Sequence, residues 1–126
     1  MIYGIGIDLA QISRIDNAYQ RWGQRFASKI LGLSELEDFK HTKRPVRFLA
    51  MRFAAKEAAS KAFGTGFKQG VAPRQIEVTH NRAGKPSLVF SGQVEKLALE
   101  NQITASHVSL TDEADFAMAY VVLETT

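Results

Sequence analysis

Hydrophobic positions near the start of the chain predict a strand followed by an amphipathic helix. Residues Ile2 to Leu9 alternate with glycine, which indicates a strand that ends at Asp8. From Gln11 to about Trp22 the larger apolar residues recur at helical spacing. These residues are Ile12, Ile15, Tyr19 and Trp22. We therefore expect this segment to be a helix with one apolar face.

Capping signals predict two further helices. The run Ser34 to Glu37 matches a capping box, in which the serine caps a backbone N–H and the glutamate reaches back, so a short helix is expected to about His41. A longer helix is expected over Val46 to Phe63, with Pro45 suited to its first position and Gly64 to its C-terminal stop. Its alanines favour helix and let another element approach closely. They are Ala50, Ala54, Ala55, Ala58, Ala59 and Ala62.

The pattern changes to alternation in the second half of the chain. Ile76 and Val78 alternate with polar residues, residues 81–86 carry turn chemistry, and residues 88–90 return as a strand, which predicts a hairpin. Ser91 is a candidate cap for a helix that follows.

That helix is expected to end at about Asn101, and two last strands follow it. They cover roughly residues 105–110 and 116–123 and flank a polar turn. This order favours one α+β domain over residues 1–126, with a largely antiparallel sheet.

Composition narrows the function classes. The chain has 126 residues, of which 45% are hydrophobic, and this suits one compact domain. No apolar run approaches the roughly 20 residues that a membrane span needs, so we expect no membrane and a cytoplasmic location. The absence of cysteine excludes disulfides, thiolate metal sites and thiol catalysis. A net charge of +3 suits an anionic partner, which is a nucleic acid, a phosphorylated cofactor or an acidic protein.

One set of residues could bind a hard cation. Asp8 ends the first predicted strand, Glu57 lies in the middle of the long helix, and Lys61 follows four residues later on the same helix face. One interpretation is a solvated turn residue beside a surface ion pair between Glu57 and Lys61. The other joins both carboxylates at Mg²⁺, with Lys61 holding phosphate oxygens. Spacing alone leaves both interpretations open.

Two basic groups could bind anions. Arg14, Arg21 and Arg25 follow one stripe of the first predicted helix and have no acidic partner on that stripe, which suits either a solvated face or an acidic partner. Near the start of the long helix, Arg44 and Arg52 stand with Lys43 and Arg47. These side chains either hold a phosphate at the helix N-terminus or serve solubility. Phosphate-loop, zinc-protease and serine-hydrolase motifs are absent from the sequence.

Read together, these segments resemble the holo-acyl-carrier-protein synthase family. Gly6-Ile7-Asp8 followed by Ile12-x-Arg14-Ile15 resembles the opening of the family, and residues 52–66 resemble its signature almost throughout. Gly84-Lys85-Pro86 and His107-Val108-Ser109-Leu110 resemble its third and fourth blocks. The likeness runs in order from about residue 4 to residue 124.

The resemblance implies transfer of phosphopantetheine from coenzyme A to a serine of acyl carrier protein, for fatty acid biosynthesis. It implies that Asp8 and Glu57 bind Mg²⁺ together with the coenzyme A pyrophosphate and that Lys61 contacts phosphate. Glu57 is the candidate base for the serine proton. The basic first helix would dock the acidic carrier, and the chain would assemble as a homotrimer with sites between subunits.

The remaining expected coenzyme A contacts also follow from the resemblance. They are Arg44, Arg52, Gly64, Thr65, Gly66 and His107. The chain departs from the pattern at Asp112, where members often carry histidine, and an aspartate cannot act there as a cation. Two alternatives remain at this point. One is a related transferase for carrier domains of secondary-metabolite synthases, and the other is a basic module that binds nucleic acid.

Overall fold

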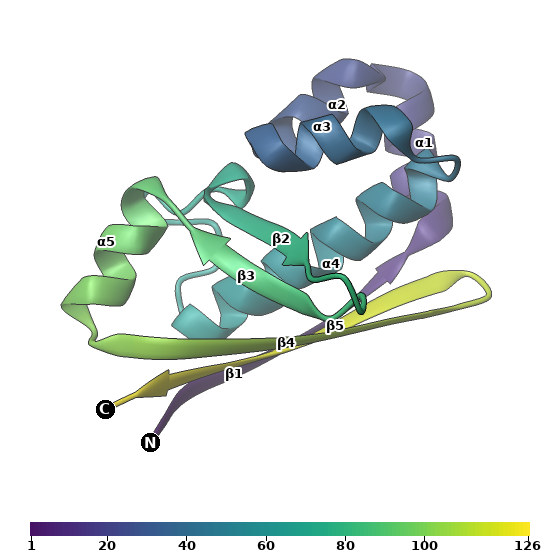
Figure 1. Cartoon of the computed structure of the whole chain (residues 1–126). Coiled ribbons are helices and arrows are strands. Elements are labelled where there is room, and N and C mark those ends of the chain that lie inside the picture. The colour runs from purple at the N-terminus through teal and green to yellow at the C-terminus, as the bar shows by residue number, and fades with distance from the viewer.

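The computed structural model describes residues 1–126, and Figure 1 shows the arrangement of its elements. The elements are β1 (Ile2–Gln11), α1 (Ile12–Trp22), α2 (Gln24–Ile30), α3 (Leu33–His41), α4 (Pro45–Phe63), the short 3₁₀ helix η1 (Pro73–Gln75), β2 (Ile76–His80), β3 (Pro86–Phe90), α5 (Gly92–Glu100), β4 (Ile103–Glu113) and β5 (Phe116–Thr125). An antiparallel sheet has the order β1-β5-β4, and β2 and β3 form a separate hairpin. The predicted α+β class with an antiparallel sheet is confirmed.

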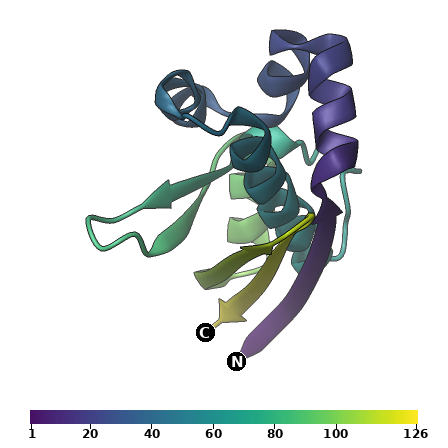
Figure 2. The same cartoon turned by 90° about the vertical axis from the view of Figure 1, so that its right-hand side faces the viewer.

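The long helix α4 packs closely against β1, and two glycines make this approach possible. A Cβ atom added at Gly4 would lie 2.0 Å from the carbonyl oxygen of Ala62, and one at Gly6 would lie 1.8 Å from that of Ala58. Both distances are far inside van der Waals contact, so only glycine fits at these two positions. The expectation that the alanines of α4 let another element approach closely is therefore confirmed. Figure 2 shows α4 lying over the sheet.

Helices α1, α2 and α3 gather at the N-terminal end of α4, above the sheet in Figure 1. Together with that end of α4 they enclose a small core of Ile15, Ala27, Ile30, Leu31, Phe39, Leu49, Ala50 and Ala117. The hydrophobic pattern did not predict α2. Its seven residues are too few to display a helical period, and Gly23, with φ of 54°, separates it from α1.

The predicted capping box at the start of α3 is wrong by two positions. The N-cap is Gly32, whose backbone N–H donates to Glu35 Oε1 at 3.0 Å. Ser34 instead donates its hydroxyl to Glu77 Oε1 at 2.9 Å, and Glu37 pairs with an exposed lysine one turn later. Contacts with β2 therefore fix where the helix begins, and the local sequence pattern does not contain them.

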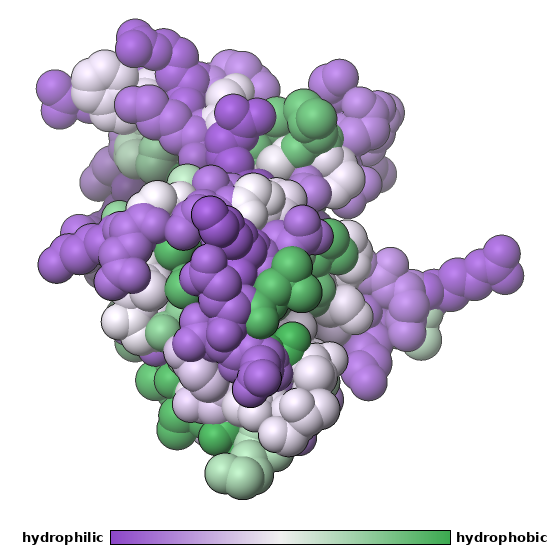
Figure 3. All heavy atoms as spheres, turned by 90° about the vertical axis from the view of Figure 1, so that its left-hand side faces the viewer, coloured by the Kyte–Doolittle hydropathy of each residue, from purple (hydrophilic) through white to green (hydrophobic).

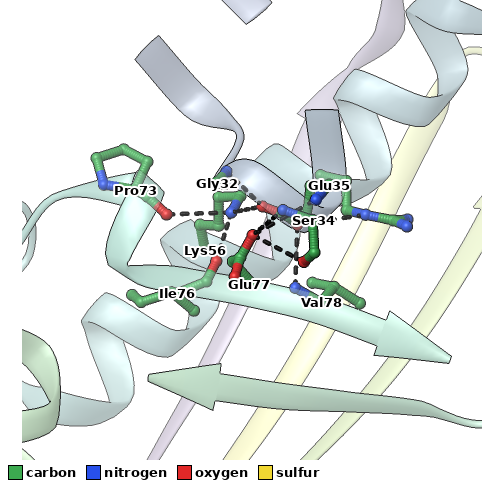
Figure 4. A network of polar contacts seen from close by, with 9 residues as sticks. Gly32, Ser34, Glu35, Lys56, Pro73, Ile76, Glu77 and Val78 are labelled. Atoms are coloured by element: carbon green, nitrogen blue, oxygen red, sulfur yellow. Dashed lines mark hydrogen bonds and ion pairs between the residues drawn. The ribbon is translucent and has the colours of Figure 1, made fainter. Parts of the chain in front are cut away.

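A buried polar network joins α3, α4 and β2 (Figure 4). Lys56 and Glu35 are both fully buried, and Lys56 Nζ lies 2.6 Å from Glu35 Oε1. Lys56 also donates to the carbonyl oxygens of Pro73 and Ile76, while Glu35 Oε2 accepts the backbone N–H of Val78 at 3.0 Å. All three ammonium protons thus have acceptors. Removing one partner of such a pair typically costs about 3–5 kcal/mol.

The strands of the main sheet are longer than predicted. β1 does not end at Asp8 but continues to Gln11, because β5 pairs with it as far as the Gln11–Phe116 partners. β4 and β5 likewise pair up to Glu113, so that the connecting turn shrinks to two residues. Asp8 therefore lies inside a paired strand, and the pleat of the sheet fixes the direction of its side chain.

One face of the sheet packs on α4, and the other face carries exposed apolar side chains. We call the second one the outer face. Its large apolar residues on β1 and β5 have 37–56% of their surface exposed. They are Tyr3, Ile5, Ile7, Leu9, Phe116, Met118 and Tyr120. In Figure 3 hydrophobic side chains gather at the lower left of the molecule, on the side of the sheet away from α4. The helices include none with the length and apolar character needed to cross a bilayer.

Candidate active site

Asp8 points toward α4 because side chains alternate along β1. Its neighbours Ile7 and Leu9 are exposed on the outer face, whereas the Asp8 side chain is only 15% exposed. The close approach of α4 at Gly6 brings the helix directly beside this carboxylate. The strand thus presents one acid to the helix at a fixed position.

Lys61 on α4 pairs with Asp8. Its Nζ atom lies 3.1 Å from Asp8 Oδ1 and 3.0 Å from the carbonyl oxygen of Ile7. Glu57 lies one helical turn earlier and makes no ion pair, so the surface pair between Glu57 and Lys61, one of the two interpretations of the sequence, is not formed. Residues more than fifty positions apart in the sequence therefore meet here.

The three side chains line one cleft of about 400 Å³, which we call the β1 cleft. Its walls come from the end of β1, from α1 and from α4, with Phe26 of α2 at one side. The complete lining is Asp8, Leu9, Ala10, Gln11, Arg14, Ile15, Ala18, Phe26, Phe53, Glu57 and Lys61. Acidic, basic and apolar groups thus share one concave surface, which is typical of a site that binds a small molecule.

Burial raises the pKa of Glu57, and the nearby Asp8 carboxylate raises it further, although Lys61 partly offsets both effects. Two carboxylates that face one cleft repel each other, and a shared divalent cation relieves that repulsion. Oxygen donors of this kind suit Mg²⁺, which binds one or two carboxylates and fills its other positions with phosphate and water. No group of three or more His, Asp or Glu side chains is arranged to hold a metal ion, so Asp8 and Glu57 form a partial ligand set.

Arg44 and Arg52 do not reach the β1 cleft. They line a different cavity of about 270 Å³ beside the first turn of α4, which we call the α4 N-terminal pocket. Its lining is Thr42, Arg44, Arg47, Phe48, Met51, Arg52, His80, Leu110 and Asp112. Arg44 is the N-cap of α4, no side chain caps the helix, and Pro45 at the first position has no N–H to offer. The free amides of this first turn attract anions.

Arg52 is held in the wall of this pocket. Only 6% of the residue is exposed, and its guanidinium carbon lies 4.1 Å over the ring of Phe48. Its Nε atom is 3.3 Å from Glu35 Oε2 but makes no hydrogen bond, and burial lowers the pKa of Arg52. Arg52 thus keeps a buried positive charge in the wall of the pocket, and such a charge favours an anionic ligand.

The structure separates the other expected coenzyme A contacts from both cavities. His107 lies on β4, where its Nε2 atom is 2.6 Å from Glu124 Oε1. Gly64 ends α4 in the left-handed region with φ of 84°, and Gly66 has φ of 60°. Thr65 between them donates to the carbonyl oxygen of Gly66 at 2.8 Å. None of the four lines the β1 cleft.

The three arginines of the predicted basic stripe belong to two helices and not to one. α1 ends at Trp22, so Arg25 belongs to α2, beyond the turn at Gly23. Arg14, Arg21 and Arg25 are exposed and make no ion pairs with other residues. The Arg21 guanidinium lies 5.0 Å from the centre of the Trp22 ring. Arg14 also lines the β1 cleft, so the stripe begins at the cleft itself.

Comparison with known proteins gives consistent matches over nearly the whole chain. The family model for the 4′-phosphopantetheinyl transferase superfamily matches residues 4–121. A holo-[acyl-carrier-protein] synthase of Vibrio cholerae serotype O1 is 51% identical over 124 residues, which cover 98% of each chain.

Solved structures agree with the sequence matches. The crystal structure of holo-[acyl-carrier-protein] synthase from Neisseria meningitidis is 42% identical, with a TM-score of 0.95 over 99% of this chain and 100% of that one. A holo-(acyl-carrier-protein) synthase from Bacillus anthracis, solved in complex with coenzyme A (3′,5′-ADP), is 38% identical. Its TM-score is 0.84, and the match covers 100% of this chain and 99% of that one.

Proposed function

Because the chain belongs to the 4′-phosphopantetheinyl transferase superfamily, among the holo-[acyl-carrier-protein] synthases, we propose that it transfers phosphopantetheine from coenzyme A to apo acyl carrier protein. The products are holo carrier protein for fatty acid biosynthesis and 3′,5′-ADP. The observation that carries this proposal is the meeting of Asp8, Glu57 and Lys61 in the β1 cleft. The Bacillus anthracis relative bound to coenzyme A supports the choice of donor.

Phosphoryl transfer depends on positioning and charge neutralisation more than on covalent chemistry by the enzyme. Asp8 and Glu57 would hold Mg²⁺, which supplies charge neutralisation at the pyrophosphate and the leaving group when it is bound. Lys61, at the same side of the cleft, binds a phosphate oxygen. Glu57 is the candidate acceptor for the proton of the carrier serine, because it faces the same cleft.

The third phosphate of coenzyme A, on the 3′ position of the ribose, fits the α4 N-terminal pocket. Arg44, Arg52 and the free amides of the first turn of α4 supply the positive field there. Arg44 and Lys61 of one chain cannot both contact the same ligand molecule. Arg44 and Lys61 lie at opposite ends of α4, roughly 25 Å apart at 1.5 Å per residue, whereas one ribose separates the 3′-phosphate from the pyrophosphate.

A homotrimer resolves this separation. The β1 cleft adjoins β1, one edge strand of the sheet, and the α4 N-terminal pocket adjoins β4, the opposite edge strand. A head-to-tail interface that closes into a ring places the β1 cleft of one copy beside the pocket of the next. The exposed apolar outer face supplies the surface that such an assembly would bury.

Arg14, Arg21 and Arg25 would dock the acidic carrier protein. These side chains are exposed and unpaired, so their charge is available to a partner. Because Arg14 lines the β1 cleft, a carrier bound along the stripe could present its serine to that cleft. The cytoplasmic location expected from the sequence stays a prediction.

A transfer assay tests the function directly. The protein is incubated with coenzyme A, Mg²⁺ and apo acyl carrier protein, and the intact mass of the carrier is followed for the added phosphopantetheine. The Asp8→Asn variant serves as the matched inactive enzyme, and omission of coenzyme A serves as the blank. An unchanged carrier mass together with tight, salt-sensitive binding of nucleic acid would contradict the proposal and favour the nucleic-acid module.

A further inference from the structure

One ion pair joins two lining residues of the α4 N-terminal pocket and is not needed for the proposed chemistry. Arg47, in the first turn of α4, contacts Asp112 near the end of β4 through Nη1 and Oδ2. Arg47 Nη2 also donates to the carbonyl oxygen of Ala114 at 3.4 Å. The two side chains are 28% and 33% exposed, and both line the pocket.

Asp112 is the one carboxylate in the lining of this pocket. Three arginines face it there, because Arg44 and Arg52 stand beside Arg47. Arg44 makes no ion pair, and Arg52 is paired only with Glu35, which lies outside the lining. Asp112 therefore lowers the positive charge of the pocket at the place where an anion would bind.

The remaining ionisable group in the lining, His80, does not restore that charge. Burial lowers the pKa of His80, and the charge of Arg52 lowers it further, so the imidazole is neutral near pH 7. The affinity of the pocket for an anion therefore depends on how strongly Arg47 is held in its ion pair with Asp112.

We propose that Asp112 is an internal counter-anion that weakens the hold of the α4 N-terminal pocket on the 3′-phosphate and so eases release of 3′,5′-ADP. This inference rests on the proposed function, since it takes the 3′-phosphate as the anion in the pocket. A phosphate that enters must share Arg47 with the carboxylate or displace it, and either event reduces affinity. Product release often limits turnover in enzymes that bind their products tightly.

A different role would be a mechanical one. The Arg47 contacts with Asp112 and Ala114 also connect the β4–β5 turn to the start of α4. If that connection were the whole role, loss of the Asp112 charge would leave the affinity for anions unchanged or would weaken it. The counter-anion role predicts that loss of the Asp112 charge increases the affinity for anions, so binding measurements separate the two roles.

The test is a double-mutant cycle with 3′,5′-ADP and with 5′-AMP, which lacks the 3′-phosphate. Calorimetric titrations compare the wild type with Asp112→Asn, Arg47→Gln and the double variant. We expect Asp112→Asn to bind 3′,5′-ADP about three- to tenfold more tightly, as removal of one unit charge near a half-exposed site does, and 5′-AMP within about twofold of wild type. Arg47→Gln alone should weaken binding of 3′,5′-ADP by a similar factor, because it removes one positive charge from the pocket, and the double variant should return close to the wild-type affinity.

Glu113→Gln is the matched control, because Glu113 is the exposed next residue of β4 and makes no ion pair. An equal gain from Glu113→Gln, an equal gain for 5′-AMP, or unchanged or weaker binding by Asp112→Asn overturns the inference. If Asp112→Asn fails to fold, as judged by thermal unfolding and light scattering, Asp112→Ser takes its place in the cycle. The transfer assay on the wild type separates failure of this inference from failure of the proposed function.

Discussion

Lys61 Nζ lies 3.1 Å from Asp8 Oδ1, and this contact pairs the helix lysine with the strand carboxylate across the β1 cleft. Glu57, one turn away on the same helix, is left without a cationic partner, and its pKa is raised. The negative charge of Asp8 is thus balanced by Lys61, whereas the charge of Glu57 has no cationic partner. This asymmetry separates the roles of the two carboxylates and underlies the first three predictions.

Replacement of Lys61 by alanine should slow transfer by about 10²-fold or more, because a positioned charge that contacts phosphate is lost. Steady-state assays with coenzyme A and carrier protein measure the change. Lys96→Ala, at an exposed position on α5, is the control and should leave the rate unchanged. A Lys61→Ala enzyme with the wild-type rate would show that Lys61 serves only the ion pair with Asp8.

Asp8→Asn and Glu57→Gln should each abolish metal-dependent turnover, since each removes one anionic ligand of the proposed Mg²⁺ site. Calorimetric titration with Mg²⁺ alone gives a readout that does not depend on activity, and both variants should lose the binding seen with the wild type. Glu100→Gln, on exposed α5, should retain it. Near-normal rates in both variants at saturating Mg²⁺ would show that the metal assignment is wrong.

Glu57→Gln should raise thermal stability near neutral pH in the absence of divalent cations. The pKa of Glu57 is raised from 4.5 by folding, so the unfolded chain ionises this group at a lower pH than the folded chain does. The protonated carboxyl stabilises the folded chain at pH values below the pKa that Glu57 has in the unfolded chain. This contribution is lost as the pH rises through the higher pKa that Glu57 has in the folded chain. Glutamine remains neutral and avoids that loss.

The measurement is the difference in melting temperature between Glu57→Gln and wild type over a range of pH. The difference should be small below pH 4.5 and should grow in favour of the variant as pH rises. The same comparison with Glu100→Gln corrects for the change in net charge. A difference that is constant with pH would mean that folding does not shift the pKa of Glu57.

Charge reversal along the basic stripe should affect the carrier protein and not coenzyme A. Arg21→Glu and Arg25→Glu should raise the KM for carrier protein much more than the KM for coenzyme A, because exposed charges mainly govern association rate and its salt dependence. Wild-type activity at low carrier concentration should fall as salt is added. Equal increases in both KM values would contradict a docking role.

Light scattering should give a mass about three times the 14.0 kDa of the chain. Mixing two inactive variants tests the site between subunits, with Glu57→Gln defective in the β1 cleft and Arg44→Glu defective in the α4 N-terminal pocket. After subunit exchange about a quarter of the wild-type activity should return, because one site in four joins two intact halves. Arg52 is unsuitable for this purpose, since a carboxylate placed there would lie buried beside Glu35.

The control mixes Glu57→Gln with Lys61→Ala, which both damage the β1 cleft. A site needs an intact β1 cleft from one chain, so this mixture should remain inactive. Recovery in the control, or a monomer with full activity, would end the model of a site between subunits.

Local signals in the sequence were sufficient to predict the helices and strands whose limits are set by residues nearby in the chain. Pro45 and Gly64 bound α4 as predicted, and the alanine-rich face between them packs on β1. The hairpin of β2 and β3 also followed from alternation and turn residues. The short helix α2 and the true cap of α3 were missed, because seven residues show no period and because Glu77 of β2 supplies the contact with Ser34.

The amino-acid sequence was enough to identify the family and to single out Asp8, Glu57 and Lys61, which stand within recognisable local motifs and meet in the β1 cleft. The partners of the charged residues, in contrast, became known only from the packing of the elements. Lys56 and Lys61 look alike in the sequence, yet one is buried against Glu35 and the other rests on Asp8 at the cleft. Helical spacing places each lysine on a face, but the strand or helix that packs there determines its partner and its exposure. That choice depends on contacts between segments far apart in the chain, which no local pattern contains.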